Sequence, residues 1–361
     1  MVPQDDKHQT GTHHPAEHPT LYETRKIMEN LISVVVCTYN QEDTIARTLD
    51  SILMQQCHVP FEIIIGEDCS TDQTLSVCET YAEKYPDKIR ILANKENKGV
   101  VDNYFDCILA SNGQYIADCA GDDFWTDPLK LEKEVTILEQ QPDVTLVHTD
   151  WHSYCETTGI STPSPKKPFT APVTQGRQML EAIITQTRIP VIHLCTSLYR
   201  ASVIRQALQD DTYMFRNKEL GCEDIQVAFT MAVQGNIAYL PDVTLNYSQG
   251  QETVSFSPDY HKQFTFARRV GDLSHYIATK HGFVNENTER YFNARAFELG
   301  MYAFRAYDQL LYQEAKVHTG KWVRKPSASL QLMFFVMRHT SLWRLGLFAR
   351  KVFVNVKQVL R

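Results

Sequence analysis

Apolar and polar residues alternate along the first half of the chain in the pattern of buried strands and amphipathic helices. The runs at 32–37 (ISVVVC) and 61–66 (FEIIIG) are continuous and rich in β-branched residues, which predicts strands buried on both faces. Shorter runs predict further strands at 89–92, 114–119 and 144–149, and the stretches between them predict helices at 41–56, 100–110 and 129–141, with another ending at residue 85. We therefore expect a doubly wound, mostly parallel α/β sheet flanked by helices.

Two polar turns carry helix-start signals. Asn40 precedes the first helical stretch, and Ser70 and Gln73 have the spacing of a capping box before the second. We expect these residues to cap the two helices.

A proline-rich stretch, residues 161–172, interrupts the alternation and is expected to be a surface loop or lid. Beyond it the pattern predicts helices at 175–185, 201–208 and 224–233, and strands at 194–199 and 237–240. From Tyr260 to the end the sequence is mainly helical.

The overall charge, with 36 basic and 43 acidic residues, argues against nucleic acid as a partner. Nine cysteines without a C-x-x-C pair indicate a reducing compartment rather than a disulfide framework. The first 20 residues contain no apolar run of the secretory type, and the longest uncharged stretch of the tail, 326–337, is too short to span a bilayer. We expect a soluble or peripheral protein.

The last 41 residues, 321–361, contain nine basic and no acidic residues. On a helix, one face of this tail would carry a set of apolar residues: Leu342, Leu345, Phe348, Val352, Val356 and Val359. Most of the basic residues fall on the other face, with Trp343 and Leu347 among them. Docking of the apolar face on the rest of the protein and binding to an anionic membrane surface are both open, and the lack of acidic residues favours the membrane.

Polar side chains follow three of the predicted strands. The first strand runs into Tyr39, the second into Asp68, and the fourth into Asp122 and Asp123. Since ligands bind at the carboxyl ends of parallel strands, these groups are expected to converge on one crevice. A ring with a hydrogen-bonding carboxylate suits a nucleobase, and clustered carboxylates suit a divalent metal bound to phosphates.

The usual phosphate-binding loops are missing. Neither G-x-x-x-x-G-K-[ST] nor G-x-G-x-x-G occurs, which excludes P-loop ATPases and dinucleotide-dependent dehydrogenases. A metal would then carry most of the charge of a diphosphate, and this points to a nucleotide-sugar enzyme.

Four segments together resemble the family-2 inverting glycosyltransferases with the GT-A fold: ISVVVCTYNQEDTIARTLDSIL, FEIIIGEDCSTDQT, NKENKGVVDNY and GQYIADCAGDDFWTDPLKLEKEV. The resemblance implies a GT-A domain at 31–258, with a nucleotide-sugar-binding half at 31–150 and an acceptor and base half at 151–258. Residues 1–30 would be a flexible N-terminal segment, and 259–361 a helical C-terminal region with a basic amphipathic tail.

The resemblance also implies roles for particular residues. Those that match the family's nucleotide pocket are Thr38, Tyr39, Asp68, Asn97, Gly99, Asn103 and Gly121.

The family's Asp-x-Asp motif reads Ala120-Gly121-Asp122 and is followed by Asp123. Asp122 and Asp123 would therefore bind Mg²⁺ or Mn²⁺, although the first aspartate is replaced by alanine. Many relatives complete the metal site with a histidine after the last strand. None occurs at 247–253, where Gln249, Gln251 or Glu252 are the alternatives.

The pair Glu223-Asp224 matches the position of the family's catalytic base. By this resemblance, Asp224 would take the proton of an acceptor hydroxyl as that oxygen attacks the anomeric carbon, with inversion, and the metal would neutralise the departing diphosphate. Trp125, next to the metal motif, would either contact the sugar or pack under the helix that follows Pro128.

The function implied is transfer of a hexosyl or N-acetylhexosaminyl group from a nucleotide sugar, a UDP-sugar, to a glycan or lipid-linked glycan acceptor. Similar proteins build bacterial surface polysaccharides, so a cytoplasmic protein, peripheral on the inner face of the membrane, is expected. Two alternatives stay open: a non-catalytic protein that binds nucleotide or glycan, and a sugar nucleotidyltransferase. The second usually has a Gly-rich basic loop, which residues 37–43 lack.

Overall fold

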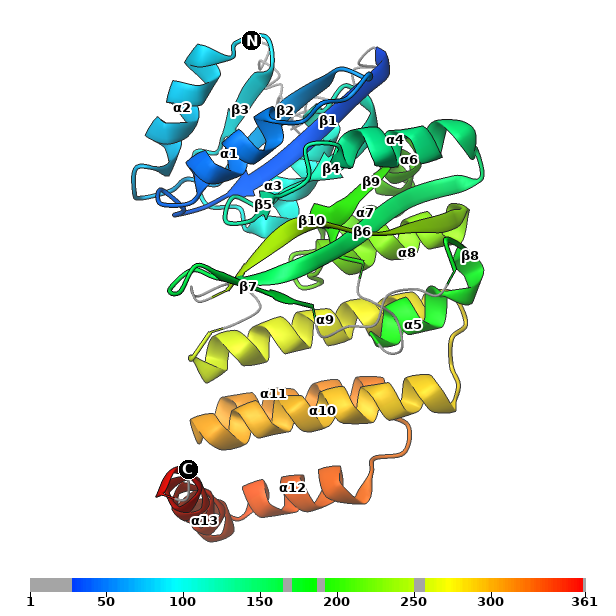
Figure 1. Cartoon of the computed structure of the whole chain (residues 1–361). Helices are drawn as coiled ribbons and strands as arrows, with labels where there is room; N and C mark the ends of the chain where they lie inside the picture. Colours follow the sequence, from blue (N-terminus) through cyan, green and yellow to red (C-terminus); the bar gives the residue numbers. More distant parts are fainter. Residues whose placement is uncertain (1–27, 165–170, 187–191, 250–256, 360–361) are drawn as a thin grey trace, which may run out of the picture.

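A computed structural model describes residues 28–164, 171–186, 192–249 and 257–359, with the backbone alone at 28–29 and 351–359. In these residues ten strands form one sheet in the order β3-β2-β1-β4-β9-β6-β10-β5, with β7 beside β6 and β8 beside β10 (Figure 1). The strands are β1 (Met28–Thr38), β2 (Phe61–Glu67), β3 (Ile89–Ala93), β4 (Gly113–Asp118), β5 (Phe124–Trp125), β6 (Val144–Cys155), β7 (Ile160–Pro163), β8 (Val173–Gln175), β9 (Ser197–Arg200) and β10 (Asn236–Gln249).

The helices fall into two groups along the chain. Those interleaved with the strands are α1 (Ile45–Leu53), α2 (Thr74–Lys84), α3 (Val100–Ala110), α4 (Lys130–Gln140), α5 (Leu180–Thr185), α6 (Ala201–Asp210), α7 (Thr212–Arg216) and α8 (Glu223–Gln234), with short 3₁₀ turns η1 (Gly176–Gln178) and η2 (Leu194–Thr196). The C-terminal helices are α9 (Tyr260–Lys280), α10 (Glu286–Ala306), α11 (Gln309–Trp322), α12 (Ala328–Arg338) and α13 (Thr340–Val359).

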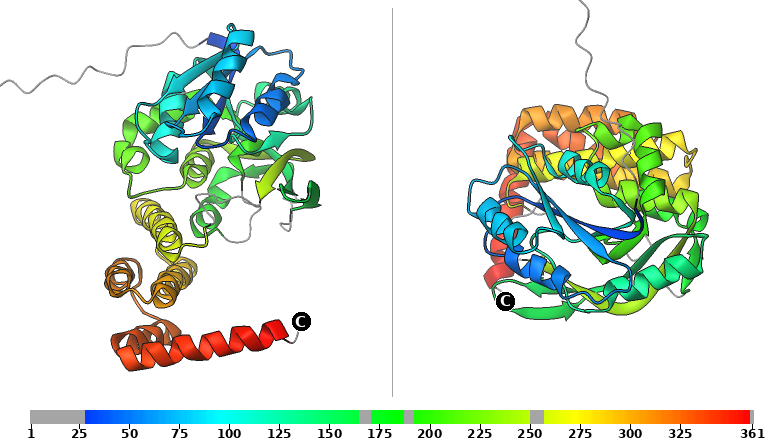
Figure 2. Two further views of the ribbon diagram at one scale, coloured as in Figure 1. Left: turned by 90° about the vertical axis from the view of Figure 1, so that its left-hand side faces the viewer. Right: turned by 90° about the horizontal axis from the view of Figure 1, so that it is seen from above.

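Both faces of the sheet are covered, as the continuous apolar strands predict. Along β1, Ile32, Val34 and Val36 face a core shared with α1, α2 and α4, whereas Val35 faces the core on the other side. That second core includes α3, α6 and α8 and continues without a break into the C-terminal helices. Figures 1 and 2 show these helices stacked in layers below the sheet, with α12 and α13 at the far end. None of the described helices combines the length and the apolarity needed to cross a membrane.

The expectation of a mostly parallel sheet is confirmed for β3, β2, β1 and β4, which run parallel to one another, and for β6 with β10. The sheet as a whole is mixed, because β9 runs antiparallel to both β4 and β6, and the short strands β5, β7 and β8 each pair antiparallel with β10 or β6. The chain enters β9 at the carboxyl end of β4, where the Cys195 sulfur accepts a hydrogen bond from the Ala120 backbone N–H. A strand that begins beside the carboxyl end of β4 can pair with β4 only by running toward the amino end of β4, which is the antiparallel direction.

The predicted helix caps are also wrong. Helices α1 and α2 begin later than predicted, and neither is capped by a side chain. The polar residues instead link the two turns to each other: the Asn40 N–H donates to the Ser70 hydroxyl (3.0 Å), and the Thr71 N–H donates to the Asn40 side chain (2.8 Å). This cross-link fixes the two turns at the carboxyl ends of β1 and β2.

Two strands extend beyond the predicted ends. β6 and β10 pair along most of their length, as far as Cys155 opposite Gln249. The predicted loop at 161–172 begins as a strand, β7, paired with β6, and residues 165–170 lie outside the described part of the chain. At the N-terminus, β1 starts at Met28, within the segment expected to be flexible.

Candidate active site

The structure brings the predicted residues of three strand ends together. β1 lies between β2 and β4, all three parallel, so their carboxyl ends share one edge. The Asp68 N–H donates to the Thr38 carbonyl (3.0 Å), and the Gly121 N–H donates to the Cys37 carbonyl (3.0 Å). Tyr39 has 45 % of its surface exposed and leaves an aromatic ring open to a ligand at this edge.

Asp68 organises the loop that follows β3. One carboxylate oxygen accepts hydrogen bonds from the Asn94 side chain and the Lys98 N–H (both 2.9 Å), and the other accepts from the Gly99 N–H (2.8 Å). The Asn97 side chain donates to the Asp68 carbonyl (3.2 Å). Gly99 has φ +83°, a left-handed conformation that suits glycine and helps both N–H groups point at one carboxylate. Asp68, Asn97 and Gly99 therefore form one hydrogen-bonded unit.

Asn103 lies behind this unit. It is buried, donates to the Gly66 carbonyl at the end of β2 (2.8 Å) and accepts from Asn94 (2.8 Å). Its hydrogen bonds join the loop that follows β3 to the end of β2, so Asn103 supports the predicted nucleotide pocket without facing it. Asn94, which the sequence comparison with the family did not single out, bridges Asp68 and Asn103.

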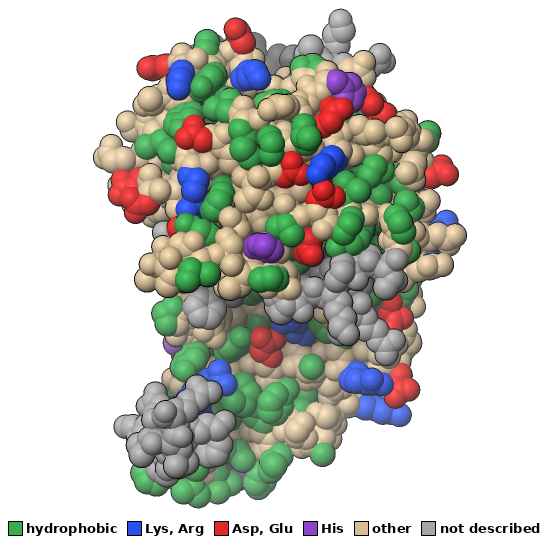
Figure 3. Space-filling model, in the orientation of Figure 1, with side chains coloured by type: hydrophobic (Ala, Val, Ile, Leu, Met, Phe, Trp, Pro, Cys, Tyr) green, Lys and Arg blue, Asp and Glu red, His purple; other side chains and the backbone are tan. Residues whose placement is uncertain are grey.

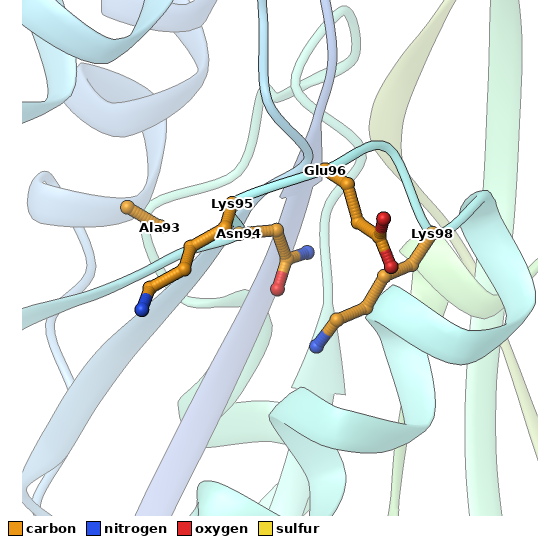
Figure 4. Close-up of a pocket in the computed structure, with 5 residues that line it drawn as sticks. All are labelled: Ala93, Asn94, Lys95, Glu96 and Lys98. Carbon is orange, nitrogen blue, oxygen red and sulfur yellow. The ribbon is translucent and has the colours of Figure 1, made fainter.

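A cleft of about 510 Å³ opens beside the same loop, lined by Ala93, Asn94, Lys95, Glu96 and Lys98. Figure 4 shows Lys95 and Lys98 extending on the two sides of the Asn94 amide. The Lys98 ammonium is paired with Asp106 on α3 (2.8 Å). Asp106 and Glu96 thus offset the charge of the two lysines beside the predicted nucleotide pocket, and nothing in the sequence pattern identified these residues.

The loop after β4 is fixed from both sides. A Cβ added to Gly121 would lie 2.7 Å from the Thr38 hydroxyl, so only glycine lets the loop approach β1 this closely. The Asp122 carbonyl accepts hydrogen bonds from the Arg47 guanidinium (2.9 Å) and the Ser248 hydroxyl (2.6 Å). Thus α1 and β10 hold the main chain at the metal motif.

Asp122 carries the carboxylate best placed for a metal. It is half-buried, and burial raises its pKa; the nearby Glu156 carboxylate raises it further, whereas the Arg47 guanidinium lowers it. Glu156 follows β6 and forms an ion pair with Arg47 (2.6 Å). Oxygen ligands are those that Mg²⁺ and Mn²⁺ prefer, so the Asp122 carboxylate suits the expected ion, whereas both oxygens of Glu156 are bound by Arg47.

Asp123 occupies a different environment from the one expected. It is 1 % exposed, and its carboxylate accepts a hydrogen bond from the Ser248 N–H (2.9 Å). Burial and then the charge of Asp122 raise its pKa well above the usual range. Its ligand atom lies within 4.8 Å of those of His193 and Cys195, a set that includes sulfur and nitrogen and is less suited to Mg²⁺. Asp123 thus anchors the loop to β10.

The predicted base lies at the start of α8. The Asp224 carboxylate accepts a hydrogen bond from the Leu194 N–H (3.0 Å), which ties it to the turn before β9. Burial, followed by the charge of Asp224, raises the pKa of Glu223 to about 7. Asp224 also contributes to the raised pKa of Asp123, which places the two acids in one electrostatic environment.

Trp125 does not face the site, so the predicted sugar contact is wrong. The residue is 1 % exposed, its indole N–H donates to the Cys195 carbonyl (2.9 Å), and the Lys130 ammonium lies 4.5 Å from the ring. It packs beneath the start of α4, as the alternative prediction had it. Among the three suggested replacements for the missing histidine, Gln249 contacts Ser153 (3.4 Å), while Gln251 and Glu252 lie outside the described residues.

Comparison with known proteins identifies the family. Residues 33–208 match the family model described as glycosyl transferase family 2. A protein of Mycobacterium tuberculosis strain H37Rv named "Uncharacterized protein Rv1520" is 43 % identical over 115 residues, which cover 32 % of this chain and 33 % of that protein. The poly(ribitol-phosphate) beta-N-acetylglucosaminyltransferase TarS of Staphylococcus aureus is 27 % identical over 233 residues, 63 % of this chain and 37 % of TarS.

The crystal structure of S. aureus TarS 1-349 in complex with UDP-GlcNAc has a similar fold. Its TM-score is 0.52 at 15 % sequence identity, and the match covers 87 % of this chain and 92 % of that one. The chain therefore contains a glycosyltransferase family 2 domain and has the GT-A fold, with a helical C-terminal region. In the sequence matches it spans about a third of the length of the curated relatives.

Proposed function

We propose that this protein is an inverting glycosyltransferase that moves a sugar from a UDP-sugar to a saccharide or lipid-linked saccharide. One observation carries the proposal: the Asp68 unit, Asp122 and Asp224, which come from three distant parts of the chain, lie around one edge of the sheet. Family membership supports glycosyl transfer, and the UDP-GlcNAc in the TarS complex supports a UDP-sugar as donor.

In this proposal the uridine lies between the Tyr39 ring and the loop that Asp68 holds. Asp122 would hold Mg²⁺ or Mn²⁺, which would neutralise the diphosphate when bound. Gly121 and Asp123 then act on the position of this loop, the first by its close approach to β1 and the second through Ser248.

Asp224 is the proposed general base. A carboxylate there would accept the proton of the acceptor hydroxyl while the oxygen forms its bond to the anomeric carbon and the bond to the nucleotide diphosphate breaks. Such assistance contributes about 10²–10⁴-fold to the rate. Glu223, whose pKa is about 7, is the neighbour that would be protonated over part of the physiological range.

We further propose that the protein works in the cytoplasm on the inner face of the cell membrane, held there by the basic segment 321–361. A lipid-linked saccharide is the acceptor class that this location favours, and surface-polysaccharide synthesis is the corresponding process.

Release of UDP tests the proposal. The full chain is incubated with Mn²⁺ and a panel of UDP-sugars, with and without saccharide acceptors, and we expect UDP to be released with at least one donor. Binding of UDP without any release would favour the non-catalytic alternative that the missing aspartate at Ala120 suggests. Release of pyrophosphate from a nucleoside triphosphate and a sugar phosphate would instead indicate a nucleotidyltransferase.

A further inference from the structure

The last two helices expose large apolar side chains at the end of the molecule farthest from the sheet. The exposed fractions are 63 % for Leu332 and 54 % for Phe335 on α12, and 38 %, 63 % and 66 % for Leu342, Leu345 and Phe348 on α13. Figure 3 shows hydrophobic side chains gathered along the lower edge, where α12 and α13 lie in Figure 1. We call these five residues the terminal apolar surface.

This surface remains after both helices have already packed against the protein. On α12, Leu330, Met333 and Met337 are buried, and Met333 reaches Gly300 on α10. On α13, Trp343 is 2 % exposed and donates from its indole N–H to the Phe304 carbonyl (2.9 Å).

Each of the two helices therefore carries two apolar faces, one packed and one open. The alternative considered from the sequence, in which Leu342, Leu345 and Phe348 dock on the protein, is wrong, because the face with Trp343 docks instead. The side chains of Val352, Val356 and Val359 lie outside those described.

The charged residues of the segment that carries the terminal apolar surface have one sign. Residues 321–361 carry nine basic and no acidic residues, and these include Arg338 at the end of α12 and Arg344 on α13. A symmetric dimer through this surface would bring the basic residues of both copies together with no acidic residue of the segment to pair with them. An anionic bilayer offers both an apolar interior and negative headgroups.

We propose that α12 and α13 together form a membrane-docking surface that inserts the five apolar side chains among anionic lipids, with the basic residues at the headgroup phosphates. The helices would lie in the plane of the membrane, since an amphipathic helix buries only one face at the interface. This goes beyond attraction by a basic tail, because it assigns binding to apolar insertion by two helices. Only the purpose of this surface, access to a lipid-linked acceptor, rests on the proposed function.

Vesicle sedimentation with the full chain tests this surface. Removing residues from 321 onward is unsuitable, because Trp322 is 3 % exposed and donates to Asp272 on α9 (3.0 Å). Point changes at exposed positions avoid this difficulty. The test variant is Phe335→Ser with Phe348→Ser, and the matched control is Ile160→Ser on β7, where the side chain is 59 % exposed.

We expect the wild-type protein to bind vesicles of phosphatidylcholine with phosphatidylglycerol much more tightly than vesicles of phosphatidylcholine alone. The double variant should bind the anionic vesicles at least tenfold more weakly, and Ile160→Ser should bind like wild type. High salt should release the double variant completely and the wild type only in part, because insertion of apolar side chains is insensitive to salt.

Equal binding by the double variant and the wild type would overturn apolar insertion. A wild-type dimer in solution that the double variant converts to a monomer, with no vesicle binding by either, would identify a second copy as the occupant and also overturn the proposal. UDP release in the presence of a soluble acceptor is measured on the same preparations. This second measurement distinguishes failure of the membrane-docking surface from failure of the proposed function. A wild-type protein that releases UDP but does not bind the anionic vesicles would refute the surface alone, and a wild-type protein that binds the vesicles but releases no UDP would refute the transferase alone.

Discussion

The hydrogen bonds of Asp68 allow the most detailed prediction. Asp68→Ala removes a carboxylate that accepts from two backbone N–H groups, those of Lys98 and Gly99, and from the Asn94 side chain. A hydrogen bond to a charged group contributes about 1.5–3 kcal/mol. The loop lies at the surface, so water replaces part of the lost hydrogen bonding. We expect the free energy that favours the closed loop over its open form to fall by about 2–4 kcal/mol.

Hydrogen exchange at individual amides measures this loss. Each ~1.36 kcal/mol corresponds to a tenfold change in an equilibrium constant, so the amides of Lys98 and Gly99 should exchange roughly one and a half to three orders of magnitude faster in Asp68→Ala. Affinity for UDP without metal should fall at least tenfold, because the loop no longer completes the pocket. Asp68→Asn keeps one acceptor oxygen, so its exchange rates and its UDP affinity should lie between those of the wild type and those of Asp68→Ala.

The control is Asp87→Asn, which removes a negative charge from an exposed position before β3. It should leave exchange and UDP affinity unchanged. Wild-type exchange rates at Lys98 and Gly99 in Asp68→Ala would show that the carboxylate does not hold the loop.

Three further predictions concern the acids of the site. Asp224→Asn should keep UDP-sugar binding and lower turnover by about 10²-fold or more, measured as UDP release at saturating donor; near-normal turnover would remove Asp224 from the role of base. Asp122→Ala should abolish the gain in UDP affinity that Mn²⁺ gives and leave the affinity for UDP without metal intact. Calorimetry with and without Mn²⁺ measures both affinities, and an equal fall in the two would contradict this prediction. Burial raises the pKa of Glu223 from 4.5 to about 7, so the folded protein holds this proton more tightly than the unfolded chain does, and stability is lost as the pH rises through this interval. Glu223→Gln should therefore increase the free energy of unfolding at pH 8 by on the order of 2–3 kcal/mol and leave it nearly unchanged at pH 4, whereas an equal effect at both values would exclude titration as the cause.

The features that could be predicted from the sequence are those that depend on local pattern. Apolar runs identify strands buried on both faces, and the residues that follow β1, β2 and β4 lie at one edge because parallel neighbours end on the same side. The direction of β9 could not be predicted, since it depends on where the chain re-enters the sheet, at a point where Cys195 lies beside Ala120, 75 residues earlier in the chain.

The partners of the site residues depend on still longer separations. Arg47 on α1 meets Glu156 after β6, 109 residues later, and Ser248 on β10 meets Asp122 from 126 residues away. β6 and β10 extend past their apolar centres because they pair with each other, and this extension is what carries Glu156 and Ser248 to the metal motif. Neither residue stands out in the sequence as a polar group at a predicted strand end.

The acids at this edge explain why a cation belongs in the proposed mechanism. Asp122, Asp123 and Glu223 all have raised pKa values, and in each case burial is the largest cause and a neighbouring acid adds to it. Holding acidic groups this close opposes folding, and Arg47, whose guanidinium is already paired with Glu156, balances only part of the charge. A divalent cation at Asp122 would reduce this repulsion, and it would offset the charge that develops on a departing diphosphate. Burial and neighbouring carboxylates therefore both disfavour charge on these acids, and a cation held by Asp122 would act on the same charges in the folded protein and in the proposed reaction.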